Sequence, residues 1–450
     1  PMTPLYVSED GGVTFRDLVR TAVHVDHHTL WVNPQDPEHL LLGNDGGIYI
    51  SRDRGESWRW QSNVPVMQLY TVSVDMQEPF YHVYGGTQDN GSWGGPTGTR
   101  FSSGVSNEDW IYTAGGDGFH SQVDPTDPNI IYAESQYGVL QRMDRRTGER
   151  RRIQPWQPQD GETPAYRWNW SAPLLISPHD PSTLYFAANV VFRSPDRGDS
   201  WEVISPDLTR QISRDSLPLQ GLIQPPDAID LHASTALFGN ISALAVSAAR
   251  TGQVAAGTDD GLVQISRNGG ESWHRTALFP GVPEMMKVSS LAWSATEEGT
   301  LFAVFDGHKD NIFSPFVVRS DDYGATWQNV TGDLPEFGPT RSVVVHPRNG
   351  NLVFVGTEFG AFFSNQGGGR WTGLPGLPTV AVHAMVVHPR DNDLVLGTHG
   401  RGFWVMDDLG LLEALGPQAV ASHSLWATPR RGTQNRDTNR GRGTVGDTYW

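Results

Sequence analysis

The sequence lacks cysteine altogether, which excludes disulfide bonds and thiol chemistry. It also lacks any apolar run of the length that a transmembrane helix needs, so we expect no span of that kind. Lysine occurs only as Lys287 and Lys309, and the formal net charge is -17, which argues against general binding to nucleic acid. Walker, Rossmann, G-x-S-x-G and H-E-x-x-H patterns are absent, so the sequence gives no reason to expect a cofactor.

Glycine, proline and tryptophan are plentiful instead, with 50, 31 and 16 residues. Much of the glycine and tryptophan falls in one recurring string, S-x-D-x-G-x-[ST]-W, as in SRDRGESW at residues 51–58. Short Ser and Asp side chains accept hydrogen bonds from nearby backbone N–H groups, glycine permits a positive φ, and the aromatic residue can pack on a neighbouring unit. The string, here called the Ser/Asp box, predicts an anchored hairpin turn. Other copies lie at residues 194–201, 266–273 and 320–327, with weaker ones at 8–15 and 364–371.

Two other signals recur with the box. A proline-bearing turn follows a strand-sized apolar run, as in VDPTDPNIIYAE, and a glycine-rich loop follows the next run, as in GNDGG at residues 43–47. Roughly eight such units follow one another at a period of about 40–55 residues, without long helical periodicity. The pattern predicts an all-β fold, a β-propeller of seven to eight four-stranded blades, and eight is the count that we favour.

On this interpretation the chain has three parts. Residues 1–20 form a partial blade that lacks its first two strands, residues 21–410 form the propeller with an insertion at 206–235, and residues 411–450 form an Arg/Gly-rich, truncated C-terminal extension. Closure of the ring then requires either strands outside this chain or pairing of the hairpin at residues 1–18 with the last blade near residues 402–408.

The box resembles the Asp-box of bacterial neuraminidase (BNR) repeats, which sialidases, sortilin-type receptors and tandem-propeller xyloglucanases share. From YVSEDGG to GTHGRGFWVMDD, the chain resembles bacterial secreted proteins of the sortilin/sialidase-like repeat class, often described as glycosyl hydrolases. The resemblance implies an extracytoplasmic location, whether periplasmic, secreted or at the cell surface, and a cysteine-free sequence is compatible with it. In that class a further propeller segment usually comes first, which makes another propeller of the same parent protein, or a larger assembly, a candidate partner.

Propeller geometry predicts which motifs lie together. The glycine-rich loops join second to third strands and share one face with the segments that lead into each next blade. This is called the Gly-loop face, and the boxes and proline turns lie at the other end of the strands. Carboxylates, amides and aromatic planes on such a face suit a sugar or a polar peptide. The ligand-binding candidates are His24, Asp26, His28, Trp31, Asn44, Gln88, Asp89, Asn90, Glu134, Gln136, Trp168, Glu358, His399 and Arg401.

Asp45 in NDGG and Asp117 in GGDGFH are the candidate catalytic acids. Both strings partly resemble acid-bearing segments of the tandem-propeller xyloglucanases, which implies a general acid and a general base across a cleft. The alternative is structural: the side chain of Asp45 would hydrogen-bond the backbone of its own turn, and Asp117 would shape a tight turn into the next blade. In the xyloglucanases the cleft lies between two propellers, so a single propeller would hold half of it.

Two histidine-bearing strings allow further interpretations. HVDHH at residues 24–28 could ligate a metal, because His24, Asp26 and His28 share one side of a strand; the alternative is an axial polar network. His399 and Arg401 could pin an anionic group or form a salt bridge at the closing seam. Sialidase activity is disfavoured, since the face offers mainly Arg401, with Arg167 nearby, rather than an arginine triad with a Tyr-Glu pair.

Two classes of function remain. In the first, which we favour, the chain is an extracytoplasmic recognition scaffold that binds a glycan or a protein through the Gly-loop face without turnover. In the second it is a xyloglucanase-like glycoside hydrolase that acts on an oligo- or polysaccharide through Asp45 and Asp117. Propellers host many functions, so the fold alone does not decide between them.

Overall fold

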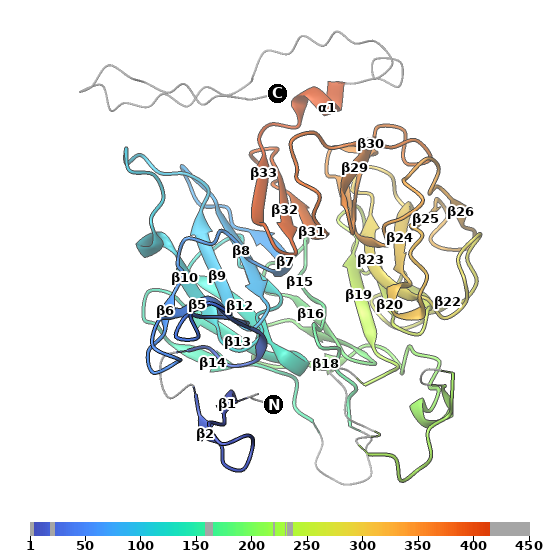
Figure 1. Ribbon diagram of the computed structural model, residues 1–450. Helices are drawn as coiled ribbons and strands as arrows, with labels where there is room; N and C mark the ends of the chain where they lie inside the picture. The colour runs from blue at the N-terminus through green and yellow to red at the C-terminus, as the bar shows by residue number, and fades with distance from the viewer. Residues whose placement is uncertain are drawn as a thin grey trace.

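The computed structural model describes residues 4–18, 23–157, 165–218, 221–229, 231 and 237–414. Over these residues the chain forms 33 β-strands and one short α-helix, α1 (Gly410–Ala414). The strands pair antiparallel into seven sheets of four strands, one of three and one of two (Figure 1). The predicted all-β fold is confirmed. Residues 415–450 of the predicted C-terminal extension lie outside the described residues.

Within each sheet, every strand pairs with the next one along the chain. The two-stranded sheet is β1 (Tyr6–Val7) and β2 (Arg16–Asp17), and the three-stranded sheet is β31 (Val382–Val387), β32 (Leu394–Thr398) and β33 (Gly402–Met406). The four-stranded sheets are β3 (His27–Val32), β4 (Leu40–Asn44), β5 (Gly47–Ser51), β6 (Arg59–Trp60); β7 (Leu69–Val74), β8 (His82–Thr87), β9 (Gly91–Pro96), β10 (Ile111–Ala114); β11 (Ser121–Val123), β12 (Ile130–Ser135), β13 (Val139–Asp144), β14 (Arg150–Arg152); β15 (Leu174–Ile176), β16 (Leu184–Ala187), β17 (Val191–Ser194), β18 (Glu202–Val203); β19 (Ile241–Val246), β20 (Val254–Thr258), β21 (Val263–Ser266), β22 (His274–Thr276); β23 (Lys287–Trp293), β24 (Leu301–Asp306), β25 (Phe316–Ser320), β26 (Gln328–Asn329); and β27 (Thr340–His346), β28 (Asn349–Thr357), β29 (Gly360–Ser364), β30 (Thr372–Gly373).

Seven of these sheets are the blades of a closed propeller. Their first strands pack side by side in the order β7, β11, β15, β19, β23, β27 and β31, and β31 packs back on β7. The ring therefore closes within this chain. The sheet β3–β6 lies outside the ring, and five of the six residues of its first strand are exposed, whereas β7, β19 and β23 have no exposed residue. The predicted seven to eight blades are thus seven blades in the ring and one sheet beside them.

The seam between the first and last blades is held by side chains from both. Tyr81 Oη donates a hydrogen bond to Asp393 Oδ2 at 3.1 Å, and His388 Nε2 lies 2.9 Å from the carbonyl oxygen of Asp75. Tyr81 also packs with Val395 in a buried apolar cluster. Both blades therefore contribute polar and apolar contacts to the closure.

The hairpin of β1 and β2 pairs only with itself in the described structure, so the predicted pairing with the last blade is wrong. It packs instead beside the sheet β3–β6, where a Cβ atom on the box residue Gly55 would lie 2.6 Å from Leu18 Cδ1. The same relation holds in the ring, where a Cβ on Gly198 would lie 2.5 Å from Ile153 of the preceding blade. Both glycines have positive φ, so these positions need glycine for conformation and for space.

The Ser/Asp boxes form the predicted hydrogen-bonded turns. In the box at residues 194–201, Asp196 Oδ1 accepts hydrogen bonds from Ser194 Oγ at 2.9 Å and from the backbone N–H of Ser200 at 2.8 Å. Trp201 Nε1 donates to the carbonyl oxygen of Ile153 in the preceding blade at 2.6 Å. The box therefore closes a hairpin and anchors one blade to the next.

Serine hydroxyl groups join successive inner strands. Ser242 Oγ on β19 donates to the carbonyl oxygen of Val288 on β23 at 2.7 Å, and Ser289 Oγ on β23 donates to that of Thr340 on β27 at 2.8 Å. Each serine occupies a β-bulge near the start of its strand, where the extra residue changes the direction of the side chain. Inter-blade contacts near the axis are thus polar as well as apolar.

The described parts of the insertion, residues 206–218, 221–229 and 231, contain the 3-10 turn η3 (Arg214–Ser216) and none of the named strands. Among the described residues, no helix combines the length and the apolar composition that a membrane span requires.

Candidate functional site on the Gly-loop face

The glycine-rich loop of the first ring blade lies beside the segment that leads into the second blade. The loop joins β8 to β9, and the segment, residues 115–120, joins β10 to β11. Gly91 N donates to the carbonyl oxygen of Gly116 at 2.9 Å, and Gly118 N donates to that of Thr87 at 3.0 Å. The prediction that loops and lead-in segments lie together is confirmed for this blade.

Three aspartates, here called the carboxylate cluster, meet at this place: Asp89 in the loop, Asp117 in the segment, and Asp45 in the loop between β4 and β5. Asp117 Oδ1 accepts a hydrogen bond from the backbone N–H of Asp89 at 2.6 Å, and its Oδ2 accepts one from Gln136 Nε2 at 2.9 Å. Asp89 has a φ of 58°, which aspartate tolerates at a turn, and its carboxylate accepts a bond from Gln88 Nε2 at 2.7 Å. The loop and the segment thus hold each other in place.

Burial and neighbouring charge oppose ionisation of two of these carboxyl groups. Burial raises the pKa of Asp117, which is 3% exposed, and the charge of Asp89 raises it further. Burial also raises the pKa of Asp89, and hydrogen bonding to Asp45 and the charge of Asp45 act in the same direction. Since neighbouring like charges disfavour joint ionisation, the cluster retains a proton at pH values where isolated aspartates are charged.

Asp45 connects the sheet β3–β6 to the ring. Asp45 Oδ1 lies 2.6 Å from His28 Nε2, and the carbonyl oxygen of Asp45 accepts a hydrogen bond from Asn90 Nδ2 at 3.1 Å. His28 occupies a β-bulge in β3, and Asn90 belongs to the loop of the first ring blade. The carboxylate cluster therefore lies where two sheets that share no edge come together.

Tyr70 is a site residue that the sequence prediction missed. Its Oη donates a hydrogen bond to Gln88 Oε1, and its ring packs on Phe119 with the centroids 4.7 Å apart. Burial raises the pKa of Tyr70 to about 12, and the charges of the carboxylate cluster add to this effect, so the phenol keeps its proton. The residue occupies a β-bulge at the start of β7, and a single sequence does not reveal where a bulge redirects a side chain.

A second polar group on the Gly-loop face surrounds Arg341 at the start of β27. Arg341 donates to Glu358 Oε2 from Nε at 3.0 Å and from Nη2 at 2.6 Å, and it also bonds Asp306. Burial opposes ionisation of Asp306, but His308 and Arg341 outweigh it and lower the pKa to about 2. Glu358, a predicted ligand contact, is thus already engaged in an ion pair.

His399 lies next to Tyr70 on the same face. His399 Nε2 lies 2.6 Å from Gln68 Nε2, and its ring stacks on His383 with the centroids 4.2 Å apart. Burial lowers the pKa of His383 to about 3 and also lowers the pKa of His399, so both rings are neutral at neutral pH. Arg401, in the same loop, is exposed to solvent.

Three other predicted ligand contacts are not bonded to the carboxylate cluster. Glu134 is completely buried because β12 continues through it, and its Oε1 accepts a hydrogen bond from the backbone N–H of Ala172 at 2.8 Å. Trp168 packs on Phe186 with the ring centroids 4.9 Å apart. Trp31 lies near the end of β3 that is remote from the Gly loop. These placements do not favour contact with a ligand bound at the cluster.

The string at residues 24–28 does not form the strand that the metal hypothesis assumes. β3 begins at His27, and Asp26 has a φ of 57°, so His24, Asp26 and His28 do not share one side of a strand. Asn44 Nδ2 donates to the carbonyl oxygen of His24 at 2.9 Å and so shapes the loop. The described residues contain no group of three His, Cys, Asp or Glu side chains placed to hold a metal ion.

Part of the predicted site does assemble. The predicted residues that hydrogen bonds join around the carboxylate cluster are His28, Asp45, Gln88, Asp89, Asn90, Asp117 and Gln136.

No family model and no curated protein matches the chain. Among solved structures, the chain is similar to an ancestral GH74 enzyme, with 15% identity and a TM-score of 0.46 over 84% of this chain and 44% of that one. It is also similar to the computationally designed Ika8 protein, with 14% identity and a TM-score of 0.43 over 84% of this chain and 95% of that one. The chain thus spans less than half the length of the GH74 structure. The propeller assignment rests on the chain's own sheets, and the sortilin/sialidase-like resemblance stays a prediction.

Proposed function

We propose that this chain is an extracytoplasmic recognition module that binds a glycan through the Gly-loop face. The observation that supports the proposal is the hydrogen-bonded carboxylate cluster with Gln88 and Gln136, whose polar groups are held in place before a ligand arrives. Carboxylate and amide groups bind sugar hydroxyl groups, and Tyr70 places an aromatic ring beside them. The extracytoplasmic location follows from the resemblance to secreted repeat proteins.

The contacts within the cluster favour binding over turnover. Glycosidases hold two carboxyl groups about 5–5.5 Å or roughly 6.5–9.5 Å apart, on either side of the bond that they cleave. Here the carboxyl of Asp117 bonds the backbone of Asp89, and the carboxyl of Asp89 bonds Asp45. The carboxyl of Asp89 therefore contacts both candidate acids, which leaves no room for a glycosidic bond between Asp89 and either of them.

Calorimetric titration with neutral oligosaccharides chosen on a glycan array tests the proposal. We expect Gln88→Ala and Asp45→Asn each to weaken binding about tenfold, the effect of losing roughly 1.4 kcal/mol of hydrogen-bonding and charge interaction. Trp31→Ala is the matched control, because Trp31 lies at the other end of the strand that carries His28. Absence of any neutral glycan ligand, or unchanged affinity in both site variants, would contradict the proposal.

A glycoside hydrolase is the second candidate function, and the raised pKa of Asp89 and of Asp117 favours it. A general acid must keep its proton near neutral pH, and both carboxyl groups are shifted in that direction. On this hypothesis Asp117→Asn abolishes turnover of β-glucan-type oligosaccharides, measured by chromatography of the products. Turnover by the unmodified chain that Asp117→Asn removes would replace recognition with catalysis, whereas binding without turnover supports recognition.

A further inference from the structure

Lys287 is a cation without a partner on an inner strand of the propeller. It is the first residue of β23, which packs between β19 and β27, and it is only partly buried, so its side chain reaches solvent. Among the described residues, its amine forms no hydrogen bond and no ion pair. Its partner in the strand register is Asp306 on β24, but the carboxylate of Asp306 is engaged by Arg341 and His308.

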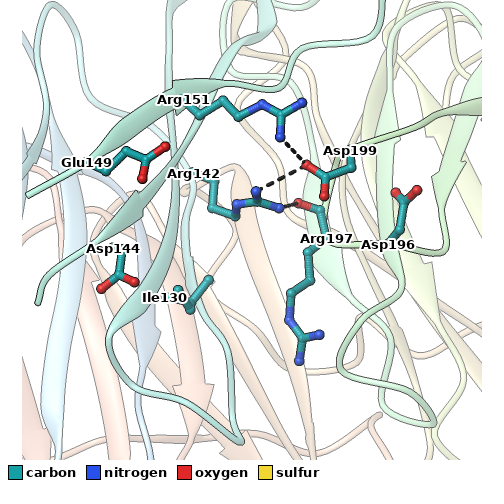
Figure 2. Close-up of a pocket in the computed structure, with 8 residues that line it drawn as sticks. All are labelled: Ile130, Arg142, Asp144, Glu149, Arg151, Asp196, Arg197 and Asp199. Carbon is teal, nitrogen blue, oxygen red and sulfur yellow. Dashed lines mark hydrogen bonds and ion pairs between the residues drawn. The ribbon is translucent and has the colours of Figure 1, made fainter. Parts of the chain in front are cut away.

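The arginines around the cavity between the blades β11–β14 and β15–β18 differ from Lys287 in this respect. This cavity has a volume of about 420 Å³. Arg142 and Arg151 lie 3.1 Å and 2.7 Å from Asp199 Oδ1 (Figure 2). Arg197 Nε lies 2.9 Å from Asp124 Oδ2. These cations are already neutralised by carboxylates, which leaves the amine on β23 as the stronger candidate for chemistry.

Asp259, in the glycine-rich loop between β20 and β21, brings an acid to the neighbourhood of this amine. Its Oδ1 accepts the backbone N–H groups of Gly239 and Asn240 at 3.1 Å and 2.9 Å, whereas its Oδ2 has no hydrogen-bond partner within the described part of the chain. Burial raises the pKa of Asp259 to about 7, and the charge of Lys287 opposes this effect. Near neutral pH this carboxyl group therefore both holds and releases a proton.

The surroundings of Lys287 favour its uncharged form. Burial lowers the pKa of the amine, and the charges of Lys309 and Arg341 act in the same direction. The charges of Asp306 and Asp259 oppose the shift without cancelling it. A larger share of this amine is thus uncharged at neutral pH than of an ordinary lysine, and the uncharged amine is the nucleophile.

We propose that Lys287 captures a short hydroxyaldehyde, the open-chain form of a small sugar, as an imine, with Asp259 as the acid that assists the loss of water. The amine nitrogen adds to the aldehyde carbon and forms a carbinolamine. The hydroxyl group of the carbinolamine leaves as water with a proton from Asp259, and the proton that the nitrogen loses returns to that carboxylate. One aldehyde is consumed and one water is released, so the step needs no oxidant and no reductant.

The neighbours of the amine also indicate the kind of aldehyde. Asp306, Arg341 and the free oxygen of Asp259 are polar, and burying such groups under an alkyl chain would cost free energy that a hydroxylated ligand avoids. This inference does not rest on the glycan proposal, because the carboxylate cluster takes no part in the reaction.

Reductive trapping with glycolaldehyde and cyanoborohydride tests the proposal, with the adducts mapped by mass spectrometry of peptides. Lys287 and Lys309 are the only lysines of the chain, and Lys309, in the 3-10 turn η4 (His308–Asp310), is exposed. At about pH 7 we expect glycolaldehyde to modify Lys287 at least tenfold faster than Lys309, the effect of about one pKa unit. Propanal should show a smaller preference. In urea the two lysines should react at equal rates, because the preference depends on the fold.

Three variants separate the roles. Lys309→Arg should keep the fast reaction and Lys287→Arg should lose it, although both keep the positive charge. Asp259→Asn should slow trapping at Lys287 at least tenfold under saturating cyanoborohydride. A purely electrostatic role of Asp259 predicts the opposite, because loss of its negative charge lowers the pKa of the amine further.

Circular dichroism and melting curves establish that the variants are folded. Equal rates at the two lysines of the folded chain, or an equal preference for Lys287 with propanal, would overturn the proposal. Unchanged or faster trapping in the folded Asp259→Asn variant would likewise overturn it.

Discussion

Tyr81 and Asp393 are 312 positions apart in the sequence and meet across the seam of the propeller, where the phenol donates a hydrogen bond to the carboxylate at 3.1 Å. Both residues are buried, at 2% and 4% exposure. In the described structure every blade consists of consecutive strands, so no blade is completed by a strand from the other end of the chain. The seam therefore depends on side-chain contacts such as this one, and on the backbone hydrogen bonds that Gly400 N and Gly402 N donate to the carbonyl oxygen of Met67 at 3.0 Å, rather than on a shared β-ladder.

We expect Tyr81→Phe to destabilise the closed ring. The substitution keeps the ring but leaves the buried carboxylate of Asp393 without this donor, and hydrogen bonds to charged groups contribute about 1.5–3 kcal/mol. The measurement is the midpoint of thermal unfolding, because a long multi-blade chain need not unfold in two states. Tyr6→Phe is the control, since Tyr6 is 56% exposed in the outer hairpin. Equal midpoints for the two variants would show that the seam does not depend on this bond.

The sequence predicted the blades because each blade repeats local chemistry. Ser, Asp and Gly at fixed spacing form the box turn through contacts within eight residues, as around Asp196. The sheet to which a repeat contributes is likewise local, since each strand pairs with the next. Whether a repeat joins the ring is not decided by local contacts. The unit at residues 27–60 has the same pattern as the others, yet it lies outside the ring, because the ring closes through contacts between two other blades, such as that of Tyr81 with Asp393.

The candidate site could be predicted only in part, for a related reason. Asp45, Asp89 and Asp117 lie in recognisable loops whose position follows from the order of strands. Tyr70 and Arg341 come from β-bulges at the starts of inner strands, and a bulge is a register shift between two strands, which a repeat pattern does not encode. The prediction placed Glu134 in a loop, but β12 extends beyond this residue, so Glu134 lies within the strand and is buried.

The stability of the protein should show the titration of Asp259. Burial and the charge of Asp260 raise its folded-state pKa to about 7, despite opposing contributions from Asn240 and Lys287, whereas an unfolded aspartate titrates at about 3.9. Between about pH 4 and about pH 7 the folded state thus holds a proton that the unfolded state releases, and stability falls as the pH rises through this window.

Asp259→Asn should remove this contribution to the pH dependence. The amide oxygen of the variant can still accept the hydrogen bonds that Gly239 N and Asn240 N donate to Asp259 Oδ1 at 3.1 Å and 2.9 Å. The thermal midpoint of the variant should therefore rise relative to that of the unmodified chain between about pH 4 and about pH 7. Above about pH 7 the difference between the two midpoints should stay constant. Glu271→Gln, at an exposed box position, is the control. A midpoint difference that is constant with pH would contradict the expected titration.

The box at residues 194–201 should tolerate Asp196→Asn better than Asp196→Ala. The box at residues 266–273 already carries Asn268, whose Oδ1 accepts from Ser272 N and whose Nδ2 donates to Ser272 Oγ, both at 3.0 Å. Alanine has neither the acceptor nor the donor, so the thermal midpoint of Asp196→Ala at neutral pH should be lower than that of Asp196→Asn.

The pH dependence distinguishes the carboxylate of Asp196 from the shape of its turn. Hydrogen bonds from Ser200 and Ser194 lower the pKa of Asp196, so its contribution to stability is present above the unfolded pKa of about 4 and is lost as the pH falls through the folded pKa. The difference between the unmodified chain and Asp196→Ala should narrow in acid. A difference that persists unchanged at low pH would assign the effect to the turn alone.

The charge of Asp45 in the outer sheet should affect the titration of Asp89 in the ring. Asp45 belongs to the sheet β3–β6, and its charge helps to raise the pKa of Asp89 in the first blade. Asp45→Asn removes that charge but keeps an oxygen that can accept a hydrogen bond, so the pKa of Asp89 should fall toward its ordinary value.

Carbon-13 NMR of Asp labelled at the carboxyl carbon follows the titration, with Asp89→Asn assigning the signal. Asp53→Asn, in the box of the same outer sheet, is the control and should leave the signal unchanged. An Asp89 titration that does not respond to Asp45→Asn would mean that the outer sheet does not reach the ring in solution, and the carboxylate cluster would then reduce to Asp89 and Asp117.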